Sequence, residues 1–300
     1  MADAGHAIFG DDRSARTAEA AVRTSARDLV VITWDGRGAP HELVHFDQAP
    51  TFDLLTIAYM GNAECPKALA KHHYFRSCTT EGKGQIFQVV SEFLDACDEN
   101  YHYVGILDDD ILIKVSDIHY LLHVARCFAL DAFAPSLGED AFHSHPHTLK
   151  REHRLLRPVR WIEVMMPFYN VELFKMASPF FSSSISSWGI DKYAIPLMQK
   201  IRGMQRTAVI DGVVASHVRP VRSAGTMYSN GFNAFQEMEL VRKRCVAYIE
   251  ANDPDLLHTE WFRETFDVPG RGARLSRTLK RLIHGGMANG RRAREALAGR

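Results

Sequence analysis

The chain has 300 residues, of which 46% are hydrophobic and 24% charged, a composition typical of folded globular proteins and unlike that of disordered, collagenous or coiled-coil chains. No apolar run approaches the roughly 18 residues that a membrane-spanning helix needs, and residues 1–30 lack the basic start and apolar core of a secretory signal. The five cysteines have no CxxC spacing, so we expect free thiols. These features predict a cytoplasmic protein with one large domain or two small ones.

The formal net charge is zero but is distributed unevenly. Residues 271–300 contain nine Lys or Arg and one acid, a net charge of +8, so residues 1–270 carry −8. Leu275, Leu279 and Leu282 share one helical face of this basic end. The pattern fits a helix attached peripherally to an anionic membrane surface, at the inner face of the membrane, and equally a solvated basic tail. Nucleic-acid binding is disfavoured because the rest of the chain is acidic.

Apolar periodicity predicts alternating strands and helices in most of the chain. Strands are predicted at residues 29–34, 52–59, 103–107, 161–166 and 209–216, and helices at 84–97, 115–130 and 190–201. Repeated strand and helix units predict an open, mostly parallel α/β sheet that binds ligands at the carboxyl ends of its strands. We expect an N-terminal arm at 1–27, the main domain at 28–250 and a helical, basic extension at 251–300.

Three consecutive carboxylates, Asp108, Asp109 and Asp110, directly follow the apolar run 103–107. They repel one another and are costly to desolvate, so we expect a cation beside them. Hard divalent cations such as Mg²⁺ and Mn²⁺ take carboxylate oxygens and fill their other positions with water and phosphate. An acidic turn or a helix N-cap is the simpler alternative.

Two later segments also end in residues with chemical roles. In Ser187-Trp188-Gly189-Ile190-Asp191 the glycine permits a tight turn, and Asp191 is expected to cap a helix or to act as a base facing the cleft. The apolar run 209–216 delivers His217 at its carboxyl end. A single histidine there is usually structural, but beside a carboxylate metal site it becomes a candidate nitrogen ligand.

In this order the motifs resemble the GT-A class of nucleotide-sugar glycosyltransferases. The resemblance is closest to a family catalogued as a domain of unknown function, with plant and bacterial members. The resemblance covers about residues 28–220. It includes three further segments: 52–59, 83–94 and Trp161-Ile162-Glu163-Val164-Met165-Met166-Pro167. The chain departs from the family at Met60-Gly61-Asn62, where many relatives have Asp-Gly after the tyrosine, and in a His-rich insertion at 139–153.

The resemblance implies a GT-A, Rossmann-like fold and sugar transfer, with inversion, from a nucleotide sugar to a glycan or lipid-linked acceptor. A UDP-sugar is favoured as donor and a GDP-sugar is the alternative. Mn²⁺ or Mg²⁺ would be bound by Asp108, Asp110 and His217, and Asp191 would be the catalytic base. Donor-binding residues would be Tyr59, Asn62, Lys83, Asp108 and Asp109. Acceptor-binding residues would be Glu163, Trp188 and Gly189.

Two other functions remain open from the sequence. One is a non-catalytic nucleotide- or carbohydrate-binding relative. The other is a metal-dependent nucleotidyltransferase, which would leave Trp188-Gly189 and His217 without a role. The histidines of segment 143–153 could hold zinc, but a polar loop that covers the acceptor is favoured because no Cys or Glu spacing accompanies them.

Overall fold

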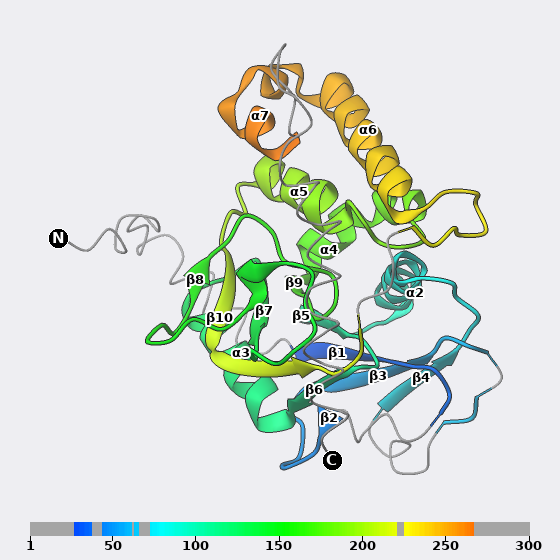
Figure 1. Ribbon diagram of the computed structural model, residues 1–300, viewed down its shortest axis with the longest axis vertical. Coiled ribbons are helices and arrows are strands. Elements are labelled where there is room, and N and C mark those ends of the chain that lie inside the picture. Colours follow the sequence, from blue (N-terminus) through cyan, green and yellow to red (C-terminus); the bar gives the residue numbers. More distant parts are fainter. Residues whose placement is uncertain (1–26, 38–43, 62, 66–72, 221–224, 267–300) are drawn as a thin grey trace.

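The computed structural model describes residues 27–37, 44–61, 63–65, 73–220 and 225–266 (Figure 1). Its strands are β1 (Arg27–Trp34), β2 (Val44–His45), β3 (Asp53–Ala58), β4 (His73–Ser77), β5 (Tyr101–Leu107), β6 (Ile111–Lys114), β7 (Ala132–Leu137), β8 (Arg157–Pro158), β9 (Phe168–Asn170) and β10 (Thr207–His217). Its α-helices are α2 (Lys83–Ala96), α3 (Val115–Cys127), α4 (Val171–Ala177), α5 (Ile195–Arg202), α6 (Ala234–Asn252) and α7 (Glu260–Phe266). A π-helix, η5 (Ile190–Ala194), precedes α5 directly.

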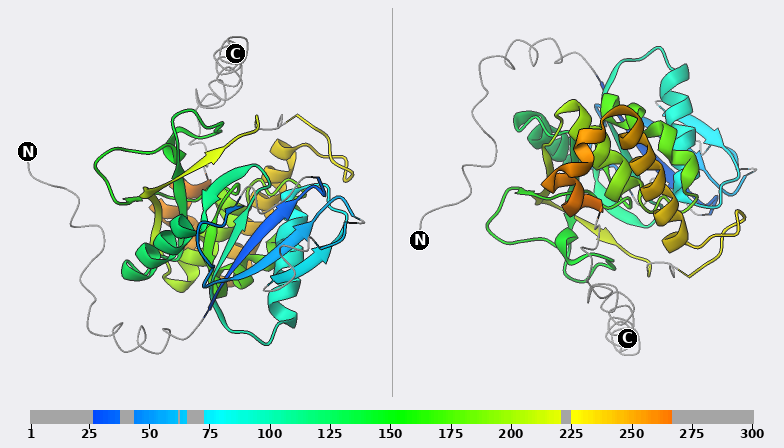
Figure 2. Two further views of the ribbon diagram at one scale, coloured as in Figure 1. Left: turned by 90° about the horizontal axis from the view of Figure 1, so that it is seen from below. Right: turned by 90° about the horizontal axis from the view of Figure 1, so that it is seen from above.

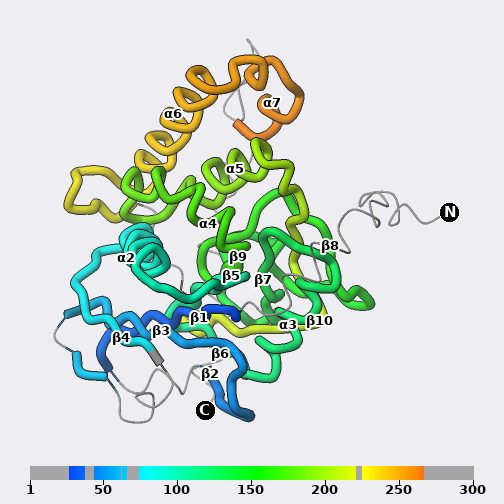
Figure 3. The backbone as a smooth tube through the Cα atoms, turned by 180° about the vertical axis from the view of Figure 1, so that it is seen from behind, coloured from blue at the N-terminus to red at the C-terminus, as the bar shows by residue number. Residues whose placement is uncertain are grey.

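The strands form one sheet in the order β2-β6-β10-β7-β9-β5-β1-β3-β4, with β8 paired to β10. Neighbours β4, β3, β1 and β5 are parallel, as are β7 and β10, whereas the short β9 runs antiparallel to both β5 and β7. Strands β5 and β10 therefore point the same way, and both carboxyl ends lie at one edge. Figure 3 follows β10 along β7 and on toward β6, with which its last residues pair.

Helices cover both faces of the sheet. In Figure 1, α2, α4 and α5 lie on one side and α3 on the other. Helices α6 and α7 form an outer layer over α4 and α5, which the view from above in Figure 2 displays. The sheet is thus the middle layer of an α/β fold, as the sequence predicts.

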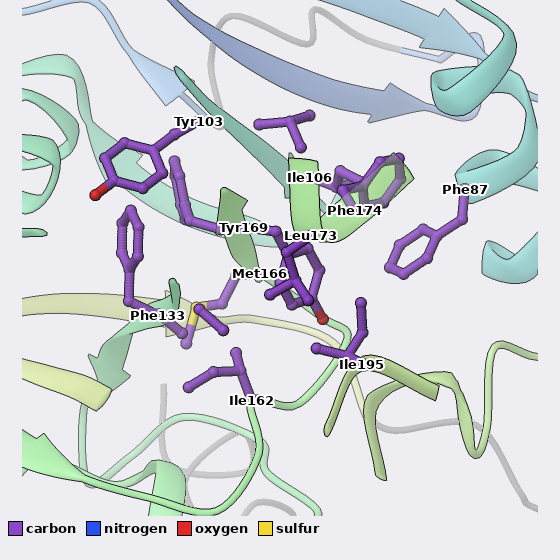
Figure 4. Packing of buried hydrophobic residues seen from close by; sticks show 14 of the residues in the cluster. Phe87, Tyr103, Ile106, Phe133, Ile162, Met166, Tyr169, Leu173, Phe174 and Ile195 are labelled. Atoms are coloured by element: carbon purple, nitrogen blue, oxygen red, sulfur yellow. The ribbon is translucent and has the colours of Figure 1, made fainter. Parts of the chain in front are cut away.

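Aromatic residues fill the core between the sheet and the helices (Figure 4). Phe133 on β7 stacks on Phe168 of β9 with ring centroids 5.3 Å apart, and Tyr103 of β5 meets Phe133 edge-on at 4.9 Å. Phe87 of α2 packs edge-on against Phe174 of α4 at 5.6 Å. All five rings are almost fully buried. Tyr169 of β9 joins the two helices to the sheet, with ring centroids 6.5 Å from Phe87 and 6.0 Å from Phe174.

Two predicted elements differ in the structure. Residues 161–166 are not a strand but an irregular segment with turns, and the strand begins only at Phe168. The backbone of this irregular segment still bonds to β5 and the residue after it. The carbonyl of Met165 accepts from the amide of Asp108 (3.0 Å), and the carbonyl of Pro167 accepts from the amide of Ile106 (2.9 Å). The predicted helix 190–201 is divided into a π-helical turn and α5, and Pro196 lies in the first turn of α5, where proline is tolerated.

The two ends of the chain, residues 1–26 and 267–300, lie outside the described residues, and so do the predicted N-terminal arm and the basic tail. Helix α6 runs across the predicted boundary at residue 250. Beyond it, Phe262 and Phe266 join the same hydrophobic core.

No described helix has the length and apolar character required to span a membrane.

Candidate active site

The acidic turn lies where β5 ends, next to the end of β10. Asp108, Asp109 and Asp110 follow Leu107 directly, and β10 pairs antiparallel with β6, so that His217 is registered opposite Ile111. The amide of Val218 donates to the carbonyl of Asp110 at 3.0 Å. The structure therefore brings together the acids and the late histidine, which are about a hundred positions apart in the sequence.

His217 is held in one orientation by a backbone contact. Its Nδ1 lies 2.8 Å from the carbonyl oxygen of Phe142, which only accepts, so Nδ1 is the protonated nitrogen. Its Nε2 lies 3.2 Å from Oδ1 of Asp110. This oxygen is buried, and no donor among the described residues has hydrogen-bonding geometry toward it. A histidine whose Nδ1–H is held by a carbonyl can offer its other nitrogen to a metal. Although burial opposes the shift, contact with Asp110 raises the pKa of His217, so in the metal-free protein the imidazole can also carry a proton and pair with this carboxylate.

Arg219 is the second residue of the β10 end that reaches the acids. Its guanidinium bonds to Oδ1 of Asp109, and its Nε lies 3.3 Å from Oδ2 of Asp110. Tyr59 donates from its hydroxyl to Oδ2 of Asp109 at 2.8 Å, and burial together with this bond raises the pKa of the phenol. Sequence reasoning missed Arg219. Its position two residues after His217, just beyond the end of β10, was the available signal, because a basic residue there lies close to the acids that His217 reaches.

Lys83 lies at the start of α2 beneath the acidic turn. Its Nζ donates to Oδ1 of Asp108 at 2.6 Å and to the carbonyls of Ile106 (3.2 Å) and Met165 (3.0 Å). Protein acceptors thus use all three of its donor positions. Burial lowers the pKa of Lys83 and raises that of Asp108 to about 6, while their mutual attraction opposes both shifts.

The chain's own cations therefore neutralise much of the acidic turn. Burial favours the protonated form of Asp110, but contact with His217 and the positive charges of Arg219 and Lys83 lower its pKa overall. In the described part of the chain, no three His, Cys, Asp or Glu side chains already surround a common metal position. Asp110 and His217 nevertheless fit two ligands of a metal that takes its remaining ligands from water and phosphate.

The Ser-Trp-Gly-Ile-Asp segment forms a tight turn into the π-helix η5. Ser187 and Gly189 both have left-handed backbones, with φ of 73° and 90°. A β-carbon on Gly189 would lie 3.0 Å from Cβ of Val241 in α6, so the turn requires glycine both for its φ and for this close approach. Asp191 follows in the first turn of η5 and is 9% exposed.

A buried glutamate, which sequence reasoning also missed, anchors this turn to α6. The carboxylate of Glu237 accepts from the amides of Ile185 (2.9 Å) and Ser186 (2.8 Å) and from the Ser184 hydroxyl (3.2 Å). On the other side of the loop, the amide of Gly84 donates to the carbonyl of Ile185 at 2.9 Å. The segment Gly82-Lys83-Gly84 thus has a packing role, because a β-carbon at Gly84 would collide with the backbone of Ser184.

Asp191 is buried, and Glu163 has a buried carboxyl oxygen, Oε2. Among the described residues, neither carboxyl group forms an ion pair with a Lys or Arg like the one between Asp108 and Lys83. Burial, and next the charge of Asp191, raise the pKa of Glu163 to about 8. Burial raises that of Asp191 to about 7, although backbone amides of its own turn oppose the shift. Glu163 also feels the charges of Asp108 and His217, so it lies within electrostatic range of both the acidic turn and Asp191.

The His-rich segment packs on the protein. His145 and His147 meet the ring of Trp161 edge-on at 4.8 and 4.6 Å. Burial lowers the pKa of both histidines to about 4, so they are neutral near pH 7. His147 and Glu163 also line a small cavity of about 10 Å³, which has room for about one water molecule.

The remaining predicted site residues occupy different surroundings. Trp188 packs edge-on against Phe235 of α6 at 5.1 Å. Tyr59 and Lys83 contact the acidic turn from other elements, as described above, whereas Asn62 is outside the described residues. The roles assigned to these side chains from the sequence remain predictions.

No protein-family model matches the chain, and no curated protein matches it in sequence. Among solved structures it is similar to S. aureus TarS, a glycosyltransferase, with 11% identity and a TM-score of 0.51 over 73% of this chain. A structure of TarS 1–349 in complex with UDP-GlcNAc matches with 10% identity and a TM-score of 0.49, over 76% of this chain and 67% of that one. This chain covers 39% of the first TarS chain. The similarity to the first TarS structure shows that the two chains share an α/β fold.

Proposed function

We propose that the protein is a metal-dependent glycosyltransferase that moves a sugar from a nucleotide sugar to a hydroxyl of a glycan or lipid-linked acceptor. The observation that carries the proposal is the Asp110–His217 pair. The histidine is fixed through Nδ1 and faces a buried carboxylate oxygen that lacks a hydrogen-bond donor, at the carboxyl edge of a GT-A-like sheet.

Asp110 and His217 would hold Mn²⁺ or Mg²⁺, with Asp108 beside them in its ion pair with Lys83. When bound, the metal supplies positive charge that stabilises the nucleoside diphosphate as it leaves. The tyrosine hydroxyl of Tyr59 and the carboxylate of Asp109 lie next to this position and belong to the proposed donor site, together with Asn62. We favour a UDP-sugar as donor, with a GDP-sugar as the alternative.

Asp191 is the proposed base. As the acceptor hydroxyl oxygen forms its bond to the anomeric carbon and the bond to the diphosphate breaks, Asp191 takes the hydroxyl proton. A pKa of about 7 suits this step, because the carboxylate is half ionised near neutral pH and still accepts a proton well. Attack from the face opposite the diphosphate inverts the configuration at the anomeric carbon.

Glu163 is the proposed partner of the base on the acceptor side. With a pKa of about 8 it keeps its proton at neutral pH, and this leaves Asp191 as the member of the pair that ionises first. The protonated carboxyl is also a hydrogen-bond donor for an acceptor oxygen. Trp188 and Gly189, in the turn that carries Asp191, complete the proposed acceptor-binding residues.

Calorimetry of UDP and GDP binding, with Mn²⁺ and with excess EDTA, tests the donor and the metal together. We expect binding only with the metal, and Asp110→Ala should abolish the metal-dependent part. Asp95→Ala is the matched control, since it removes a carboxylate that pairs with Lys175 at the exposed end of α2. Equal affinity of the nucleotides in EDTA would contradict the proposal.

Product analysis separates the remaining alternatives. A glycosyltransferase releases nucleoside diphosphate from a nucleotide sugar in Mn²⁺, with slow hydrolysis when no acceptor is present. A nucleotidyltransferase would instead release pyrophosphate from a nucleoside triphosphate. Tight nucleotide binding with neither product would indicate the non-catalytic relative.

A further inference from the structure

Arg219 bridges two of the three acids through contacts that lie on the open side of the site. Its guanidinium contacts Asp109, and its Nε lies 3.3 Å from Oδ2 of Asp110. Its side chain is 45% exposed, whereas those of Asp109 and Asp110 are 12% and 16% exposed. Arg219 is therefore the outermost charged group of this cluster and the one that can leave it without opening the core.

His217 and Arg219 contact opposite oxygens of a single carboxylate. Nε2 of His217 faces Oδ1 of Asp110, and Nε of Arg219 faces Oδ2. A divalent cation shared by Asp110 and His217 would place two positive charges beside the guanidinium and draw electron density from the carboxylate. The metal and Arg219 are thus alternative counter-ions of Asp110, and binding one weakens the other.

The released guanidinium would find a new anionic partner, because the proposed donor brings a diphosphate to the same edge of the sheet. A guanidinium pairs with phosphate through two parallel hydrogen bonds, an arrangement that the compact ammonium group of lysine does not offer. Val218 remains bonded to the carbonyl of Asp110, so the backbone holds Arg219 next to the metal position while its side chain reorients.

We propose that Arg219 is an exchangeable cation that neutralises Asp109 and Asp110 in the metal-free protein and passes to the donor diphosphate when the metal takes Asp110. The inference rests on the proposed function, because it needs a metal and a diphosphate at this edge. It assigns Arg219 a donor-binding role and predicts that the residue acts in opposite directions on two binding steps.

Calorimetric titration of the full chain with Mn²⁺ alone, and then with UDP and GDP in saturating Mn²⁺, tests the exchange. In Arg219→Ala, the affinity for Mn²⁺ alone should rise by roughly tenfold, because the competing positive charge is gone. The affinity for the nucleotide in Mn²⁺ should fall by roughly tenfold or more, because the phosphate contact is lost. Arg219→Lys should bind Mn²⁺ like the parent but bind the nucleotide more weakly.

Arg202→Ala is the matched control, because Arg202 pairs with Glu172 and neither residue contacts the acidic turn. It should change neither affinity, and thermal unfolding should confirm that all variants are folded. An Arg219→Ala variant with unchanged or weaker Mn²⁺ affinity would overturn the exchange, as would unchanged nucleotide affinity. If neither parent nor variant binds Mn²⁺, both the exchange and the metal-dependent function are wrong.

The same titrations distinguish the failure of one proposal from that of the other. Mn²⁺ binding by Arg219→Ala but not by the parent would support the exchange in its strongest form. The expected Mn²⁺ shift without nucleotide binding to the parent would overturn the transfer to diphosphate. Both expected shifts without any transfer product would overturn the glycosyltransferase proposal and leave the exchange supported.

Discussion

The acidic turn and the Glu163–Asp191 pair bury carboxyl groups in two different ways. In the turn, Asp108 bonds to Lys83 at 2.6 Å, and Asp110 lies between His217 and Arg219. In the pair, burial dominates and raises the pKa values to about 8 and about 7. The first group is neutralised by neighbouring cations, and the second is neutralised by protons.

This difference determines what each region can exchange. Carboxylates that stay ionised can trade one cation for another, which suits a metal and a diphosphate. Carboxyl groups that titrate near neutrality can trade protons, which suits a base. The buried pair Arg157–Asp211, joined at 2.9 Å and nearly inaccessible, shows that an ion pair alone does not make such a site. Exchange also needs a cation that solvent can reach, and the half-exposed Arg219 is such a cation beside the acidic turn.

The largest effect is expected from removing the buried cation of the acidic turn. Lys83→Met should lower the free energy of unfolding by roughly 3 kcal/mol, because it leaves the partly buried carboxylate of Asp108 without its partner. Chemical denaturation measures this. The double variant with Asp108→Asn should recover part of the loss, and a double variant as unstable as the single one would show that Lys83 acts by packing alone.

The next effect concerns the proton-exchanging pair. Asp191→Asn should lower turnover by ~10² or more while leaving nucleotide affinity in Mn²⁺ nearly unchanged, because a positioned base supplies a factor of this size. In the parent, turnover should rise as the pH passes about 7, where Asp191 ionises, and the variant should lack this rise. If the variant keeps its turnover, Asp191 is not the base and its role is to cap the helix.

A smaller effect is expected in the pH dependence of stability. The pKa of Glu163 is raised in the folded chain to about 8 from an ordinary 4.5, so the folded state binds more protons than the unfolded one between these values. Stability contributed by this group is present below pH 4.5 and is lost as the pH rises toward 8. Glu163→Gln should therefore remove this loss, so that its free energy of unfolding exceeds that of the parent at pH 8.

The control for that measurement is Glu152→Gln, which removes an exposed carboxylate of the nearby loop that pairs with Lys150. It should leave the slope of stability against pH unchanged. A parent whose stability does not fall between pH 5 and 8 would place Glu163 in a much more polar environment than its burial implies.

The smallest effect on the site is expected from the basic tail, a third concentration of charge that lies outside the described residues. Deleting 271–300 should release the protein from anionic liposomes without changing hydrolysis of a soluble donor, since the proposed metal and base residues all precede residue 220. Each basic residue near such a surface contributes roughly 1 kcal/mol, so attachment should be sensitive to salt. If replacing Leu279 and Leu282 by Ser leaves liposome flotation unchanged at ~0.15 M salt, the helix hypothesis fails.

Local patterns in the sequence were sufficient to identify the main strands and helices. The β-branched run before Trp34 and the apolar run before Asp108 became β1 and β5, because continuous apolar segments suit strands buried on both faces. The helical spacing between residues 84 and 97 became α2. From these elements alone, the acids could be assigned to the carboxyl edge of a parallel sheet, and the α/β fold followed.

What the sequence could not supply are contacts between residues distant along the chain. Residues 161–166 contain apolar side chains like those of a strand, yet their backbone bonds to β5 in an irregular path. Glu237 anchors a turn that ends some fifty positions earlier, and the raised pKa of Glu163 comes from the surrounding core and from Asp191.

The same division applies to the charges of the site. The sequence by itself determined that three acids follow a buried strand and that a cation must compensate for them, because their mutual repulsion is local. Only the tertiary structure decided which groups do so, namely Lys83 from α2, His217 at the end of β10 and Arg219 just beyond it. Coulomb interactions depend on distance in space, and the fold alone sets the distance between residues that are more than a hundred positions apart.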